Sequence, residues 1–189
     1  MGAVGLTASE QVGWTGLSIT GTTAGLLIVM LLSTPMQTVG EEIMFRGVFL
    51  PAAGSWFRSA KPAFLTGLIL SSAMFALLHG SIDPMLFAYY LFFSVCTAVM
   101  GLLTRGLEAA IAFHTANNLV TTTLNAVLSG GGAVAVERSG GSTGGLALLL
   151  PAAGSLAVLV MVGLRERSPR RAGLGVRHRQ QHADRPVDH

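Results

Sequence analysis

Polar and ionisable residues recur at helical spacing in an otherwise apolar chain. In three pairs the residues are four positions apart: Glu42 and Arg46, Phe75 and His79, His114 and Asn118. Residues four apart share one face of a helix. Ionisable groups at membrane depth are costly unless they are paired or hydrated, so by default they mark a functional site. The pattern therefore predicts that some of these side chains perform chemistry.

The adjacent carboxylates of Glu41 and Glu42 have different expected roles. On a helix Glu42 faces Arg46, and an acid four residues before a base pairs well, so we expect this pair to be structural. Glu41 points about 100° away, at 3.6 residues per turn, and needs another partner. A partly desolvated carboxylate in a membrane cavity suits a general base that takes a proton from water. We predict that Glu41 is this base.

The two histidines extend this chemistry. We expect His79 to share the water with Glu41. His114 and Asn118, stacked on one helix face, offer hydrogen-bond donors for the oxyanion that forms when a carbonyl group is attacked. Asn117 faces elsewhere and is the weaker candidate.

Each pair also has an ordinary structural explanation, because a buried histidine is more often a hydrogen-bonded core residue than a catalyst. The scarcity of histidines and acidic residues in this chain favours a functional role for these pairs. His79 and His114 are the only histidines before the C-terminal tail. Glu41 and Glu42 are two of the six acidic residues before position 165. By contrast, we expect the aromatic run 87–93 to face lipid or to pack, rather than to form a substrate groove.

The composition indicates an integral membrane protein. Charged residues make up 11% and apolar residues 51% of 189 positions, and the mean hydropathy is +0.61. Soluble domains carry roughly 25% charged residues. At this length we expect one compact helical domain. The expected partners are membrane lipids and a peptide or membrane-protein substrate, and no nucleic acid, because the basic excess is confined to a short tail.

Membrane-spanning helices of about 20 residues must position these side chains. Apolar stretches predict an all-α fold, a polytopic transmembrane helix bundle of about six helices: 16–39, 41–57, 62–79, 84–104, 107–128 and 146–164. Residues 1–35 lack the basic start of a signal sequence, so we count an N-terminal transmembrane helix there. The remaining divisions are a core, a Gly/Ser-rich loop with a last helix, and a basic tail expected to be disordered: 36–129, 130–164 and 165–189.

The tail contains seven arginines and three acidic residues. By the positive-inside rule we expect it in the cytoplasm, in a multi-pass protein of the cell membrane. An even number of helices would place the N-terminus on the same side. The predicted boundaries put Glu41 and His79 near the outer ends of their helices, whereas His114 lies ~10 Å from the opposite end of its own. A shifted boundary or a broken helix is therefore expected.

The three motifs, taken in order, resemble those of a known family. The matches are to EExxxR at residues 41–46, FxxxH at residues 75–79 and HxxxN at residues 114–118. Over roughly residues 36–129 the chain is similar to the CPBP (Abi) family, the intramembrane proteases similar to type II CAAX prenyl endopeptidases. The region before the first motif is short for that family, which implies that one or two N-terminal helices are missing.

The resemblance implies an all-helical membrane peptidase with defined residue roles. Glu41 and His79 would activate a water molecule, while His114 and Asn118 would stabilise the oxyanion. Three further motif residues would support the site structurally: Glu42, Arg46 and Phe75.

Zinc is the alternative to a mechanism without metal. A glutamate and two histidines can hold zinc with three ligands and an open position. The HExxH spacing typical of helical zinc peptidases is absent from the sequence, so we favour glutamate chemistry with no cofactor. A GxSG-like serine motif is also absent, which argues against a rhomboid-type serine protease.

Three functions remain open on the sequence. The first is an intramembrane endopeptidase that cleaves a peptide bond within or next to the membrane. The second is a non-catalytic family member, such as a bacteriocin-immunity or membrane scaffold protein, although every motif residue is intact. The third is a small proton-coupled transporter, which would be expected to show an internal repeat that this sequence lacks.

Overall fold

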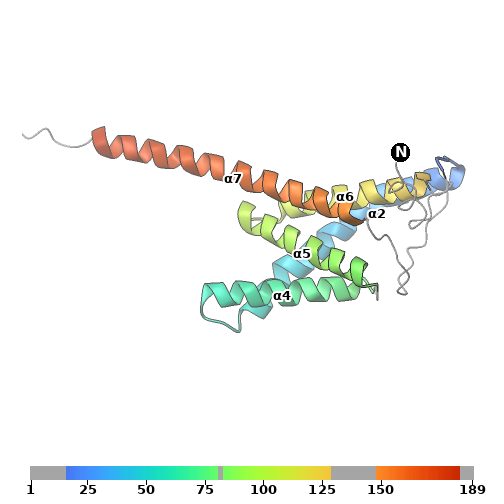
Figure 1. The fold of residues 1–189 in the computed structure, drawn as a ribbon, viewed down its shortest axis with the longest axis horizontal. Coiled ribbons are helices and arrows are strands. Elements are labelled where there is room, and N and C mark those ends of the chain that lie inside the picture. The colour runs from blue at the N-terminus through green and yellow to red at the C-terminus, as the bar shows by residue number, and fades with distance from the viewer. Residues whose placement is uncertain (1–15, 81–82, 129–147, 184–189) are drawn as a thin grey trace, which may run out of the picture.

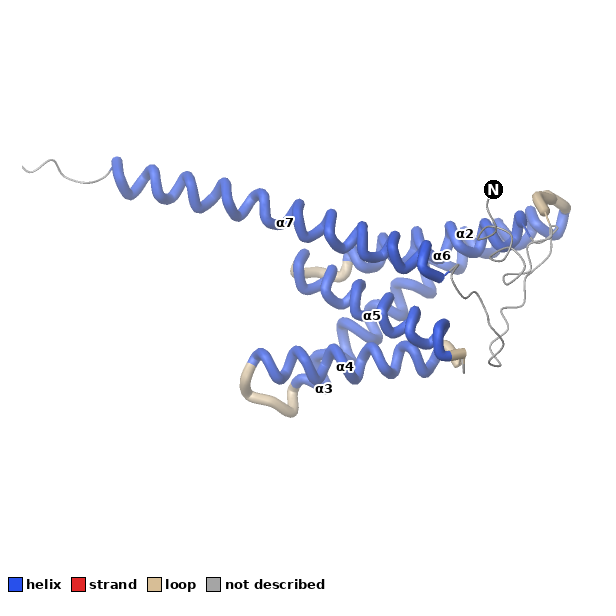
Figure 2. The backbone as a smooth tube through the Cα atoms, in the orientation of Figure 1, coloured by secondary structure: helices blue, strands red, loops and turns tan. Residues whose placement is uncertain are grey.

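The computed structural model describes residues 16–80, 83–128 and 148–183, with residues 168–183 as backbone alone. Helices dominate it (Figures 1 and 2). They are α2 (Gly21–Glu42), the π-helix η1 (Ile43–Phe49), α3 (Leu50–Gly54), α4 (Ala60–Leu78), α5 (Pro84–Thr104), α6 (Glu108–Leu128) and α7 (Leu149–Ala183). The predicted all-α class is confirmed, and α5 has the predicted bounds.

The first two predicted helices are in fact one, which corrects the boundary predicted near residue 40. α2, η1 and α3 follow one another without a break from Gly21 to Gly54. The charges do not end the helix because Glu42 pairs with Arg46 inside it, so neither side chain has to reach water. Counted this way, the described residues form five helices, one fewer than predicted.

The π-helix η1 directly follows the two glutamates. Single π-turns occur rarely inside α-helices, and those that do occur are often found at functional sites. Ser71 of α4 donates a hydrogen bond of 2.7 Å to the carbonyl oxygen of Phe45, which lies within η1. α4 therefore contacts the backbone of this wider turn directly.

Four helical segments among the described residues are long and apolar enough to cross a membrane: Gly21–Gly54, Ala60–Leu78, Pro84–Thr104 and Leu149–Arg167. The protein is therefore a multi-pass membrane protein. α6 is not among these four, and it contains histidine, asparagine and threonine side chains. It packs along α2, where the hydroxyl oxygens of Thr38 and Thr115 lie 2.6 Å apart. Polar groups in membrane helices are accommodated by facing another helix in this way.

α5 is the central helix, in contact with α4, α6 and α7 (Figure 1). Phe45, Phe75 and Phe93 come from η1, α4 and α5 and form a buried aromatic cluster. α4 also crosses α3 closely. A Cβ atom added to Gly54 or to Gly67 would collide with a backbone carbonyl of the other helix, so only glycine fits this crossing.

The last helix is longer than predicted. α7 continues to Ala183, although the sequence predicted a disordered tail from residue 165. The expectation of disorder for residues 165–189 stays a prediction. The predicted Gly/Ser-rich loop and the last six residues lie outside the described residues.

Basic residues gather at one end of the bundle. The α3–α4 turn contains Arg58, the α5–α6 turn contains Arg105, and α7 contains Arg165 and Arg167 beyond its apolar part. Figure 1 shows both turns and the far end of α7 at the same end. The start of α2 lies at the other end, because merging the first two helices removes one crossing. Within the described residues the helices therefore number five when α2, η1 and α3 are counted as one.

Candidate active site

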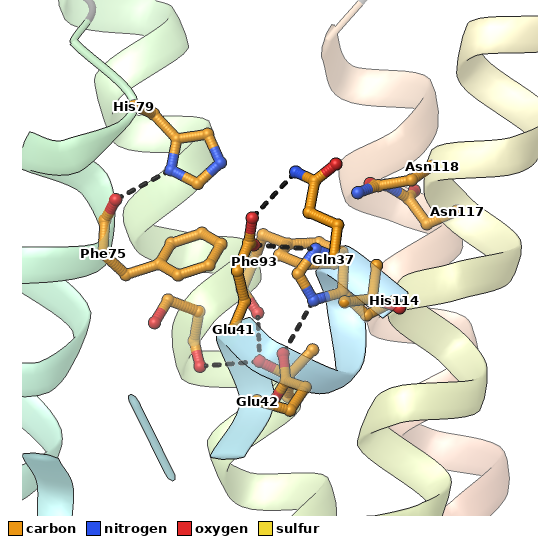
Figure 3. A network of polar contacts seen from close by, with 12 residues as sticks. Gln37, Glu41, Glu42, Phe75, His79, Phe93, His114, Asn117 and Asn118 are labelled. Carbon is orange, nitrogen blue, oxygen red and sulfur yellow. Dashed lines mark hydrogen bonds and ion pairs between the residues drawn. The ribbon is translucent and has the colours of Figure 1, made fainter. Parts of the chain in front are cut away.

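Glu42 is the centre of a fully buried charge network. Its side chain is 0% exposed, although it lies on a membrane-spanning helix. One carboxylate oxygen, Oε2, lies 3.1 Å from Arg46 Nε, as the i, i+4 spacing predicted. The other, Oε1, lies 2.8 Å from His114 Nδ1 of α6 (Figure 3). Each carboxylate oxygen has a partner, so Glu42 connects His114 of α6 to Arg46 of η1.

Arg46 is held in turn by α5. Its Nη2 donates hydrogen bonds to the Ser94 carbonyl oxygen at 3.2 Å and to the Ser94 hydroxyl at 3.1 Å, and it also contacts the Thr97 hydroxyl. The guanidinium carbon lies 4.8 Å from the centre of the Phe75 ring, in cation–π range. A buried guanidinium is tolerated only with such partners.

Glu41 lies at the open edge of this network. Its side chain is 22% exposed, in contrast to the buried Glu42 next to it. Oε1 accepts a 2.8 Å hydrogen bond from the amide Nε2 of Gln37, one turn earlier on α2. Oε2 lies 3.6 Å from His114 Nε2. The carboxylate is therefore fixed on one side and faces His114 on the other.

His114 bridges the two glutamates. Because an ionised carboxylate can only accept, the hydrogen on Nδ1 donates to Glu42 and fixes the orientation of the ring. Nε2 is then directed toward Glu41. The ring is 2% exposed and packs edge-on against Phe93, with 4.9 Å between the ring centres. His114 is thereby held rigidly with Nε2 at the open side of the site.

His79 ends α4 and is held by an equally rigid arrangement. Its Nδ1 donates a 2.8 Å hydrogen bond to the Phe75 carbonyl oxygen, which can only accept. In a neutral ring Nε2 is then the acceptor. Phe75 packs against the ring with centres 4.4 Å apart, and Tyr90 does so at 4.1 Å. The chain turns away at Gly80, whose φ of 63° is the left-handed conformation that favours glycine at a helix end.

A cavity of about 30 Å³ lies between these groups. Its lining comes from α4, α5 and α6: Phe75, His79, Tyr89, Tyr90, Phe93, His114, Asn117 and Asn118. A cavity needs roughly 10 to 15 Å³ of such volume to hold one water molecule. The space therefore suits one or two water molecules, with two imidazoles and two carboxamides around them.

The structure brings the three motifs together, which the predicted boundaries did not. His79, His114 and Asn118 line one cavity, and Glu41 reaches it through His114. α2 continues past Glu41, so Glu41 lies within a continuous helix rather than at a helix end, whereas α4 ends at His79. Figure 3 shows Glu41 between His79 and His114 in this view.

Several neighbours of the site were missed from the sequence. Gln37 was not considered, although its spacing of four from Glu41 was a usable signal. The aromatic run 87–93 was expected to face lipid or to pack; Tyr89, Tyr90 and Phe93 pack around the buried aromatic cluster and also line the cavity. They do so because α5 lies at the centre of the bundle rather than at its lipid-facing surface. Asn117, the weaker candidate, also lines the cavity.

Zinc would need three ligands directed at one point. His79 and His114 each have Nδ1 committed to an oxygen acceptor, which leaves Nε2 of each ring as the available nitrogen. Among the described residues, no group of three or more His, Cys, Asp or Glu is placed to hold a metal ion. A mechanism without metal stays a prediction.

Comparison with known proteins identifies the family. The chain matches the sequence model described as type II CAAX prenyl endopeptidase Rce1-like over residues 23–120, which is more than half of its length. The matched region contains all three motifs and begins earlier than the predicted position 36. No curated protein and no solved structure gives a match. The chain therefore belongs to the Rce1-like family of type II CAAX prenyl endopeptidases, which are membrane peptide hydrolases.

Proposed function

We propose that this protein is an intramembrane endopeptidase that hydrolyses a peptide bond within or next to the membrane with a glutamate-activated water. One observation supports this above the others. The partly exposed side chain of Glu41 directs Oε2 at His114 Nε2, which borders a water-sized cavity also lined by His79 and Asn118. A base, a confined water and hydrogen-bond donors are the parts that such a hydrolysis requires.

In the proposed reaction Glu41 takes a proton from a water molecule in the cavity. The water oxygen forms a bond to the carbonyl carbon of the substrate, and the carbonyl electron pair moves to oxygen. His79 accepts a hydrogen bond from the same water through Nε2, because its Nδ1 is committed to the Phe75 carbonyl oxygen. The carbon–nitrogen bond then breaks, and the proton held by Glu41 passes to the leaving amine.

The oxyanion formed in this step needs donors that are already in place. Asn118 supplies a carboxamide N–H from the cavity wall. His114 has Nε2 at the open side of the site, where it would donate to the oxyanion when that nitrogen carries a hydrogen. Glu42 and Arg46 act at a distance from the substrate, since they hold His114 and η1 in position.

The basic end of the bundle gives the proposed orientation. We place the α3–α4 turn, the α5–α6 turn and the far end of α7 in the cytoplasm, because loops rich in arginine and lysine are retained there. A cysteine introduced at Ser168 after replacement of Cys96 should then react with an impermeant thiol reagent only in permeabilised cells. Labelling in intact cells would invert this orientation.

The proposed activity is tested with purified protein in detergent and a library of internally quenched peptides. The wild type should cleave peptides, and Glu41→Gln purified in the same way should not. Added zinc or a chelator should leave the wild-type rate unchanged. A protein that binds peptides without cleaving them would instead support the non-catalytic alternative, and loss of activity on chelation alone would reject the mechanism without metal.

A further inference from the structure

Gln37 occupies an unusual position for a polar side chain. It lies sixteen residues after Gly21 and seventeen before Gly54, at the middle of the longest candidate membrane span. At 1.5 Å per residue this is about 24 Å from either helix end, beyond the reach of a glutamine side chain. The residue is exposed, and its neighbours Leu32 and Met36 are 68% and 78% exposed and apolar.

An exposed amide among lipid-facing residues is costly unless it has a partner. The partner is Glu41, whose Oε1 accepts the hydrogen bond from Gln37 Nε2 at 2.8 Å. The amide nitrogen rather than the amide oxygen must face Glu41, because an ionised carboxylate can only accept. Figure 3 shows the Gln37 side chain directed at Glu41, on the side away from Glu42.

This contact determines which oxygen of Glu41 is available for chemistry. With Oε1 held by Gln37, the other oxygen, Oε2, is directed to His114 Nε2 at 3.6 Å. Oε2 is buried and has no hydrogen-bond partner among the described residues. The carboxylate group of a glutamate can rotate about the last bond of its side chain unless a second group holds it in one orientation.

We propose that Gln37 is a positioning residue that fixes the Glu41 carboxylate with Oε2 toward the cavity. This inference rests on the proposed function, in which Glu41 is the general base. Gln37 acts through Glu41 and does not touch the reacting atoms. Misplacement of a catalytic group by about 1 Å can cost on the order of 10²-fold in rate.

The test compares three variants with the wild type under saturating and limiting peptide. Gln37→Leu keeps most of the side-chain volume and removes the donor, so kcat should fall about 10- to 100-fold while KM stays unchanged. Gln37→His keeps an uncharged N–H donor within reach of Glu41 and should recover most of kcat. Ser33→Ala, one turn earlier on the same exposed face, is the matched control and should behave as wild type.

Each other result rejects the inference. A wild-type kcat in Gln37→Leu means that Glu41 needs no such partner. A loss in Gln37→Leu that Gln37→His does not recover, or a change in KM alone, means that Gln37 acts through folding or by contacting the substrate. Gln37→Leu added to Glu41→Gln should lower residual activity no further. Failure of the wild type to cleave any peptide rejects the proposed function itself, and this result differs from every result that rejects only the role of Gln37.

Discussion

Glu41 and Glu42 are adjacent in sequence but lie in two different regions of the molecule. Glu42 lies in a closed region, with Arg46 on one oxygen and His114 on the other. Glu41 lies in an open region, with a single hydrogen bond from Gln37 and one oxygen left toward His114. A helix separates consecutive side chains by about 100°, so Glu41 and Glu42 point in different directions. Glu42 is fully buried, whereas the side chain of Glu41 is 22% exposed.

The two positions show how one membrane helix can hold one carboxylate fully paired and the next one only partly paired. A buried charge must have all of its partners supplied by the protein. Glu42 meets this condition, and so it connects α2, η1 and α6 without being free to react. Glu41 depends on that framework through His114 but is not itself buried. Under the proposed mechanism, stability and chemistry are thereby divided between two identical side chains.

Replacing Glu41 gives the largest expected effect on activity. Glu41→Gln keeps the shape of the side chain but cannot take a proton from water, so we expect a loss of about 10⁴-fold in kcat. Its free energy of unfolding should change by less than about 0.5 kcal/mol, since the residue lies outside the closed network. Peptide cleavage and thermal melting in detergent measure the two quantities. Wild-type turnover in this variant would remove Glu41 from the mechanism.

Replacing one member of the buried ion pair gives the largest expected effect on stability. Glu42→Gln or Arg46→Gln leaves the other charge buried without its partner, which should cost about 3 to 5 kcal/mol. The double variant removes both charges and should fold better than either single variant. Expression level and melting temperature provide the comparison. Three variants of equal stability would show that the two side chains are not coupled.

Replacing Asn118, which lines the cavity, should lower kcat less than replacing Glu41 does. Loss of one oxyanion donor typically costs about 10² to 10³-fold in kcat, so Asn118→Ala should keep activity that Glu41→Gln lacks. KM should be little changed because the donor acts on the transition state. Asn117→Ala is the matched control on the same cavity wall, and it should lose less. An equal loss in both variants would assign the effect to packing.

Local sequence patterns predicted more of this molecule than long-range ones. The bounds of α5 follow from Asp83, Pro84 and Arg105, because an N-cap, a proline at the first turn and a charged end are local signals. The continuity of α2 with η1 was not predicted, because it depends on the partners of a charge that the helix itself contains. The pairing of Glu42 with Arg46 was predicted because an acid four residues before a base on one helix is also a local signal.

The assembly of the site required information that spacing along the chain does not contain. His114 was expected to act with Asn118 alone, and its bond to Glu42 joins residues 72 positions apart. The cavity depends on three helices, and the sequence could not decide whether the aromatic residues of α5 face lipid or pack, because their neighbours in space were unknown. A period of 3.6 residues shows which side chains share a face, but not which helix that face meets.

The smallest predicted effect concerns an uncharged contact one turn from Glu42. The Thr38 and Thr115 hydroxyls lie 2.6 Å apart between α2 and α6, and Thr38 is 0% exposed. Thr38→Val keeps the shape and removes the hydroxyl, so it should cost about 1 kcal/mol, because hydrogen bonds between membrane helices average about 0.6 kcal/mol. Combining it with Thr115→Val in a double-mutant cycle isolates the contact from the bond that Thr38 also makes to the Pro35 carbonyl. A loss as large as that of Glu42→Gln would mean that the pairing of α2 with α6 depends on this contact, and that the closed region extends beyond its charged residues.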